Sequence, residues 1–276
     1  MRPALAPPIP YFGGKQRIAA QIVATFAPHK HYIEPYAGSL SVLLAKPPVT
    51  FETVNDLDKH LVTFWRVLRD RPDDLHRAAS LTPHSRAEMV ASRKIPDGAD
   101  EVEIARRVWV ELTQSRAGLR ASSGWRYSLD ADTSTTSLPG YLDGYRGRMH
   151  PAAARLAHVS LENRDALDVI ADYGQAPTSL LYVDPPYLPT TRTSGKYRHE
   201  ADHAHHEALL SALLGCKAHV ALSGYRSDLY DEALTGWHVT SIAATTQQAN
   251  KVGANKRTEV VWTNYEPHAT LLGATS

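Results

Sequence analysis

Apolar residues recur along the first part of this 276-residue chain at the spacings of strands and of helices. Residues 31–46 and residues 51–72 each show a short apolar run, a turn, and then apolar residues three or four positions apart. Two strand–turn–helix units in succession predict a mostly parallel sheet covered by helices. The second helix is expected to bury one face, which consists of Leu61, Phe64, Trp65 and Leu68.

This pattern stops near residue 70 and resumes near residue 155. From there to residue 265, apolar strand-like runs again alternate with helical ones. The segment between contains helical stretches and then a region rich in Gly, Ser, Thr and Arg. We therefore expect an α/β fold with helices on both faces of the sheet, in which residues 1–70 and 155–276 form one domain. Residues 71–154 would form an inserted, mainly helical region.

Composition limits the cellular compartments in which the protein could work and the kinds of partner that it could bind. The chain has 30 Lys and Arg against 29 Asp and Glu, so a nucleic acid could be bound only by a local patch of charge. The single cysteine, Cys216, excludes an internal disulfide and a cysteine-based zinc site. The N-terminus is broken by prolines, and no apolar run is long enough to cross a bilayer. These features predict a soluble, cytoplasmic protein with no membrane partner.

The sequence SLLYVDPPY, residues 179–187, ends an apolar strand on a carboxylate and two prolines. Asp184 would therefore lie at the carboxyl edge of the sheet, where ligands of such folds bind. The prolines stiffen the chain, so the Pro185 carbonyl is interpreted as a second fixed acceptor beside the Asp184 carboxylate. Tyr187 offers a flat ring on which a planar base could stack.

Two adjacent acceptors suit an amino group that carries two hydrogens. The exocyclic amine of adenine or cytosine is a poor nucleophile, and acceptors on both N–H bonds would offset the positive charge that develops when it attacks a methyl sulfonium. The base would have to leave the duplex to reach such a site. This reasoning leaves adenine and cytosine both open, although Cys216 does not lie in the Pro-Cys setting that carbon methylation of cytosine would need.

Two further segments suit a nucleotide-like cofactor. The turn Tyr36-Ala37-Gly38-Ser39 follows the first expected strand, and Asp56 and Asp58 end the next one. A small-residue turn and a carboxylate at this spacing are typical of sites that bind an adenosine, with the acid on the ribose hydroxyls. The sequence YFGGKQR at 11–17 lacks the hydroxyl of a phosphate-binding loop, so it could also be a plain turn beside Lys15.

With these motifs in this order, nearly the whole chain resembles the Dam-like (alpha group) adenine-specific DNA methyltransferases. The segments YFGGK, EPYAGSLSV, NDLD, ENRDALDVI and DPPY carry the resemblance. It implies a Rossmann-like methyltransferase fold, S-adenosyl-L-methionine as cofactor without a metal, double-stranded DNA as substrate, and a bacterial or phage source. The cofactor-binding residues that it and the preceding motifs indicate are Tyr11, Lys15, Tyr36, Gly38, Ser39, Asp56, Asp165 and Asp184.

The expected insertion supplies the local positive patch. Arg106, Arg107, Arg116, Arg120 and Arg126 occur within residues 104–127, where Glu111 is the one acid and aromatic residues are interleaved. Arginines suit phosphate contacts and guanine edges, and aromatic rings suit stacking. Part of the segment also resembles the recognition segment of the family. The predicted DNA-binding residues are Arg116, Arg120, Trp125 and Arg126, although any one arginine could be an ordinary surface residue.

Two features depart from this interpretation. Leu40 stands where the family commonly has a second glycine, so either this position is helical or the cofactor pocket is altered. A DNA-binding module without catalysis therefore stays an alternative. His199, Glu200 and His203 match the zinc-protease signature H-E-x-x-H, but Asp202 is expected to cap a helix that starts there, which leaves His199 outside it. A partner restriction endonuclease is a further expectation, and no oligomeric state is predicted.

Overall fold

The computed structural model describes residues 5–116, 124–127, 138–188, 202–242 and 258–267. In this part of the chain, seven strands form one sheet in the order β3-β2-β1-β4-β5-β7-β6. Strands β1 to β5 are parallel, and β7 pairs antiparallel with both β5 and β6. The predicted mostly parallel sheet is confirmed. Its strands are β1 (His31–Glu34), β2 (Phe51–Asn55), β3 (Ser160–Glu162), β4 (Ser179–Val183), β5 (His219–Gly224), β6 (His238–Ile242) and β7 (Glu259–Thr263).

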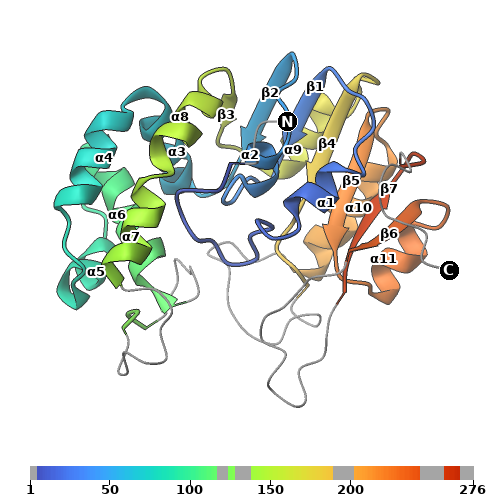
Figure 1. Cartoon of the computed structure of the whole chain (residues 1–276). Helices are drawn as coiled ribbons and strands as arrows, with labels where there is room; N and C mark the ends of the chain where they lie inside the picture. The colour runs from blue at the N-terminus through green and yellow to red at the C-terminus, as the bar shows by residue number, and fades with distance from the viewer. Residues whose placement is uncertain (1–4, 117–123, 128–137, 189–201, 243–257, 268–276) are drawn as a thin grey trace, which may run out of the picture.

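Helices cover both faces of the sheet, as expected (Figure 1). Neighbouring residues of one strand point to opposite faces, so Tyr32 of β1 joins one buried apolar cluster and Ile33 joins the other. The first cluster includes residues of α1 (Ala19–Val23), α2 (Ser41–Ala45) and α3 (Lys59–Asp70). The second includes residues of α9 (Ala166–Tyr173), α10 (His203–Leu214) and α11 (Asp228–Ala233).

The segment after α3 is helical and gathers beyond the β2–β3 side of the sheet (Figure 1). Helix α3 packs against α6 and α8, and the buried cluster of α1, α2 and α3 continues into Trp109 and Leu112 of α6. The core on this face of the sheet therefore extends into the helical segment. Its helices are α4 (Pro72–Leu81), α5 (Arg86–Ser92), α6 (Glu101–Gln114), α7 (Leu138–Arg146) and α8 (Met149–Leu156).

Local sequence explains where several helices begin. The Asp58 carboxylate accepts from the amides of His60 and Leu61, so α3 begins directly after it. The four apolar residues predicted for one face of this helix are all buried. Asp202 accepts from the His205 amide at 2.8 Å, which confirms it as the N-cap of α10. Helix α1 ends at Val23, and the amides of Thr25 and Phe26 then donate to carbonyls three positions earlier, as in a 3₁₀ turn.

The strand order fixes where a ligand can bind. From β1 the chain moves outward to β2 and β3 on one side, and later from β4 to β5 on the other. The order therefore reverses between β1 and β4, and crevices of open α/β sheets form at the carboxyl ends of the strands at such a point. Glu34 ends β1, and Asp184 directly follows β4. The two carboxyl groups flank the reversal.

Candidate active site

A cavity opens at this reversal point, and its wall comes from segments far apart in the sequence. All eight residues that sequence motifs indicate for the cofactor lie in this wall. Glu34, Tyr182, Pro186 and His205 line it as well. The motifs of the first sixty residues thus meet the end of β4 in one site. The predicted cofactor residues that line it are Tyr11, Lys15, Tyr36, Gly38, Ser39, Asp56, Asp165 and Asp184.

Lys15 and Asp184 form an ion pair within the cavity wall. The Lys15 ammonium donates to both carboxylate oxygens of Asp184 at 2.7 Å and to the Gly13 carbonyl at 3.0 Å. Burial lowers the pKa of Lys15, but the carboxylates of Asp184 and Glu259 outweigh it, so the pKa is raised and the lysine stays charged. Ser223 also donates to Asp184, at 3.0 Å. Asp184 is thereby held from two sides.

Tyr187 is placed beside the cavity rather than in its wall. Its hydroxyl donates to the carboxylate oxygens of Glu259 at 2.9 and 3.1 Å. Its ring lies 4.6 Å from the ring of Tyr225 and 4.9 Å from the Lys15 ammonium. Burial raises the pKa of Glu259, although Lys15 opposes the shift. Pro185 is buried and is not part of the cavity wall.

The turn after β1 is fixed by contacts with residues around it. Gly38 has φ +47°, and a Cβ there would lie 3.1 Å from the Tyr11 ring. Its amide donates to Asp56 at 2.9 Å, and its carbonyl accepts from the Trp65 indole at 3.0 Å. Asp56 also accepts from the Asp58 amide at 2.9 Å. The Asp58 carboxylate itself caps α3, so Asp56 is the better placed of the two acids to meet a ligand.

The side chains of Glu34 and His205 also line the wall, although sequence reasoning did not single them out. Glu34 is buried and accepts from the Tyr32 hydroxyl at 3.0 Å. Burial and the nearby Asp184 carboxylate raise the pKa of Glu34 to about 8. Tyr36 and His205 are hydrogen-bonded at 2.8 Å between the phenol oxygen and Nε2, which joins the turn after β1 to α10. Asp165 caps α9 by accepting from the Leu167 amide.

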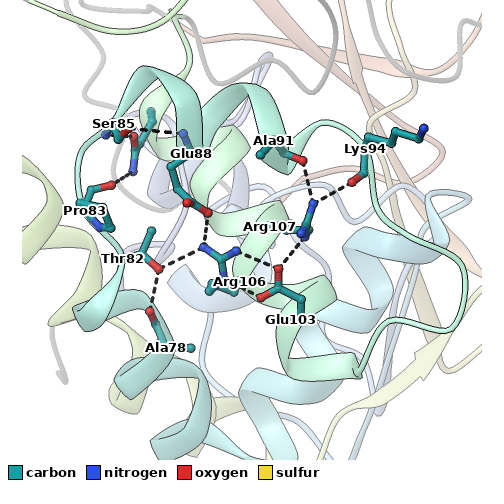
Figure 2. Close-up of polar contacts among 11 residues, drawn as sticks. Ala78, Thr82, Pro83, Ser85, Glu88, Ala91, Lys94, Glu103, Arg106 and Arg107 are labelled. Carbon is teal, nitrogen blue, oxygen red and sulfur yellow. Dashed lines mark hydrogen bonds and ion pairs between the residues drawn. The ribbon is translucent and has the colours of Figure 1, made fainter.

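The arginines of the helical segment fall into two groups. Arg106 donates to Glu103 and Glu88 at 2.6 Å and to the Thr82 hydroxyl at 3.2 Å (Figure 2). Arg107 donates to Glu103 at 2.6 Å and to the carbonyls of Ala91 and Lys94 (Figure 2). These two guanidinium groups join α5 to α6. They are structural rather than available to a ligand.

The second group lies where the chain leaves α6. Ser115 and Trp125 form an antiparallel bridge, and the amides of Arg116 and Arg126 donate to the carbonyls of Gly124 and Gln114 at 2.8 Å. The guanidinium of Arg116 lies over the Tyr127 ring and that of Arg126 over Tyr141. Predicted DNA-binding residues Arg116, Trp125 and Arg126 are thus neighbours. Arg120 lies outside the described residues.

Comparison with known proteins identifies the family. Residues 11–95 and 147–248, more than half of the chain, match the sequence profile of the D12 class N6 adenine-specific DNA methyltransferases. The chain belongs to this family. A Type II methyltransferase, M1.LlaDCHI of Lactococcus lactis subsp. cremoris, is 25% identical over 287 aligned positions, which span 95% of this chain and 96% of that protein. The protein is therefore an adenine-specific DNA methyltransferase, and the cytosine alternative is set aside.

In this methyltransferase, Leu40 occupies the position where the family commonly has a second glycine. The residue has φ 55° and ψ 27°, a left-handed conformation, and is the one non-glycine residue with positive φ in the described ranges. Of the two alternatives that the sequence left open, a helical conformation at this position is therefore wrong. Leu40 is fully buried and does not line the cavity. The turn keeps the conformation that favours glycine and accommodates leucine at a cost in strain.

The remaining expectations concern metals and membranes. Helix α10 begins at His203, and the His199 and Glu200 of the H-E-x-x-H match lie outside the described residues. Within the residues that the structure describes, no three or more His, Cys, Asp or Glu are grouped as metal ligands. In the same ranges, no helix combines the length and apolar character needed to span a membrane. DNA is the substrate, and enzymes of this class generally use S-adenosylmethionine.

Proposed function

We propose that this methyltransferase binds S-adenosylmethionine in the cavity at the β1–β4 reversal and methylates a flipped adenine held by Asp184. The charge of the cavity wall supports this cofactor. Five carboxyl groups and one lysine line it, and the four aspartates outnumber the lysine even where Glu34 is protonated, which suits a ligand that carries a sulfonium and an ammonium group. Those carboxyl groups belong to Glu34, Asp56, Asp58, Asp165 and Asp184.

The contacts of the wall suggest which residues would hold each part of the cofactor. Asp56 is held by two backbone amides and would accept the ribose hydroxyls with its remaining lone pairs. Gly38 would let the cofactor approach the backbone, and Tyr11 and Ser39 would enclose that approach. Tyr36 and Asp165 would line the site of the cofactor's adenine ring. When bound, the cofactor supplies an electrophilic methyl group.

Asp184 is the group that carries the mechanism. Its carboxylate accepts from Lys15 and Ser223, yet four lone-pair sites leave room for one N–H of the adenine amine. By its place in the D-P-P-Y motif, the carbonyl of Pro185, which lies outside the cavity wall, would accept the second N–H. Together they would localise the lone pair on the nitrogen and stabilise the positive charge that forms there as the N–C bond forms and the S–C bond breaks, its electron pair passing to sulfur. The methylated nitrogen would then release a proton to water. Lys15 would balance the charge of the carboxylate.

Tyr187 would supply the surface on which the flipped base stacks. Its hydroxyl is held by Glu259, and Tyr225 packs beside its ring. A ring fixed in this way loses little freedom when a base arrives. The double-stranded DNA would be bound by residues 71–154, which we assign as the target-recognition domain inserted into the catalytic domain of residues 1–70 and 155–276. Arg116, Trp125 and Arg126 are its proposed contacts.

A restriction endonuclease is the proposed biological partner. The support is the Type II methyltransferase whose sequence aligns over nearly the whole chain. Methylation of its own site would then protect the DNA of the host. Expression of the methyltransferase should make that DNA resistant to one endonuclease, and persistent sensitivity to all endonucleases with adenine-containing sites would argue against this role.

The product and the cofactor test the proposed function together. Purified protein should transfer labelled methyl groups from S-adenosylmethionine to unmethylated duplex DNA, and hydrolysis should yield N6-methyladenine. Calorimetry should detect cofactor binding by the wild type, a marked weakening in Asp56→Ala, and no comparable change in the exposed Asp73→Ala on α4. Affinity for DNA without cofactor binding or label would instead contradict the proposed function.

A further inference from the structure

Arg86, which no sequence motif singled out, lies on the aromatic rings that follow α6. Its guanidinium carbon is 5.0 Å from the Trp125 ring centroid and 5.4 Å from that of Tyr127. The two rings are nearly parallel, at 19°, with centroids 5.7 Å apart. His84 stacks on Trp125 at 4.6 Å and 24°. Arg86 and His84 thus form one surface with Trp125 and Tyr127, which lie about forty positions later in the sequence, after α6.

Buried hydrogen bonds hold these two pieces of chain together. The fully buried Gln114 accepts from the Ser85 amide at 3.0 Å and donates to the Pro83 carbonyl at 2.9 Å. Figure 2 shows Pro83 and Ser85 side by side at the start of α5. Gln114 also accepts from the Arg126 amide through its backbone carbonyl. One residue therefore fixes the start of α5, which carries Arg86, against the segment that carries Trp125.

The charge on this surface is open to a ligand. In the described part of the chain, Arg106 and Arg107 have carboxylate partners, whereas Arg86, Arg116 and Arg126 lie over rings. Stacking orients a guanidinium without using its N–H donors, so among the described residues the exposed guanidinium of Arg86 keeps its donors for a ligand, whereas Nε of Arg126 is buried. Arg86, Arg116 and Tyr127 are all exposed, and both guanidinium groups lie over the ring of Tyr127.

We propose that Arg86, held on Trp125 and Tyr127, contacts a phosphate of the duplex DNA that the methyltransferase acts on. The inference rests on the proposed role of residues 71–154 in binding DNA and adds a contact from α5. Among the described residues no carboxylate pairs with Arg86, and a phosphate is the ligand that an exposed guanidinium held on two rings fits best. Such a contact orients the duplex on the protein and does not read its sequence.

Arg86→Gln tests the contact, with Arg77→Gln as the matched control. Arg77 is exposed on α4 in the same helical segment and, among the described residues, lies over no ring. The variant therefore loses the same charge without the stacked contact. DNA affinity would be measured by fluorescence anisotropy with several labelled duplexes at a series of salt concentrations. Arg86→Gln should weaken binding severalfold on every duplex and lower the salt dependence by about one ion. Arg77→Gln should match the wild type, and cofactor affinity should be unchanged in both.

The other outcomes distinguish failure of the inference from failure of the proposed function on which it rests. Wild-type affinity and salt dependence in Arg86→Gln would overturn it, and if that variant and the wild type both still methylate DNA, the proposed function would stand. A loss confined to one sequence with the salt dependence unchanged would indicate a base contact and overturn the phosphate assignment. Arg86→Lys, which keeps the charge without the planar stack, should keep the salt dependence. Failure of the wild type to methylate DNA would instead refute the proposed function itself.

Discussion

Lys15 lies 169 positions before Asp184 in the sequence, yet its ammonium is 2.7 Å from each oxygen of that carboxylate. The lysine side chain is 5% exposed and the aspartate side chain 18%. Removal of one partner from such a pair leaves a poorly solvated charge, whereas removal of both does not. The ion pair therefore links the fold of the N-terminal segment to the group that we assign to catalysis.

Lys15→Gln should lower the free energy of unfolding by about 3 kcal/mol, because Asp184 loses its cation. The double variant with Asp184→Asn should recover a large part of that loss. Chemical denaturation of the two single variants and the double variant measures the coupling. Additive effects in the double variant would mean that the ion pair does not form.

Glu259 should act through Tyr187. Glu259→Ala and Tyr187→Phe each remove one side of the same hydrogen bond, so each should slow methyl transfer while leaving cofactor affinity near the wild-type value. The double variant should be no slower than the slower single variant, since the residues act as one unit. Steady-state kcat and calorimetry give the two readouts, with Tyr187→Leu as the more severe control because it removes the ring. Multiplicative losses in the double variant would refute the link.

Glu34 should make stability depend on pH. Its pKa is about 8 in the folded protein against an ordinary value of 4.5, so its ionisation opposes folding. The contribution of its protonated form is complete below the ordinary pKa and is lost as the pH rises through 8. The wild type should therefore lose stability relative to Glu34→Gln, on the order of a few kcal/mol, between about pH 5 and about pH 9. Parallel stability curves for the two proteins would contradict this.

At Leu40, the glycine variant should be more stable than the alanine variant, which is the reverse of the order expected within a helix. Both substitutions remove the same buried side chain, but glycine alone is unstrained at positive φ. Leu40→Gly should therefore be less destabilising than Leu40→Ala by about 1 kcal/mol. At Leu43, which is equally buried but within α2, the glycine variant should be the worse by about 1 kcal/mol. The same order at both positions, measured by thermal unfolding, would rule out strain at Leu40.

Sequence patterns were sufficient for the fold and for the position of the cavity. Asp184 and the turn around Gly38 could be recognised because each follows a short apolar strand, and parallel strands bring such ends together. Glu259 and Ser223 could not be recognised, because their roles depend on β5 lying beside β4 and on β7 lying beside β5. Arg86 was missed for the same reason, since its partners lie about forty positions away in the sequence.

The same limit explains why the arginines were grouped incorrectly. Arg106, Arg107 and Arg116 look alike as a basic cluster, but Glu103 and Glu88 neutralise the first two across a helix interface. Helical spacing could have indicated the pair between Glu103 and Arg107, which lie four positions apart on α6. The pair between Arg106 and Glu88 joins two helices, so local sequence does not reveal it.

The most direct test is single-turnover methyl transfer by Asp184→Asn. The asparagine keeps the size of the side chain but removes the charge and one acceptor that we assign to the adenine amine. We expect DNA affinity within a few-fold of the wild type, cooperative unfolding at a lower temperature because Lys15 loses its partner, and a rate of N6-methyladenine formation at saturating cofactor lower by about 100-fold or more. A rate comparable with that of the wild type, with both ligands bound, would contradict the assignment of Asp184.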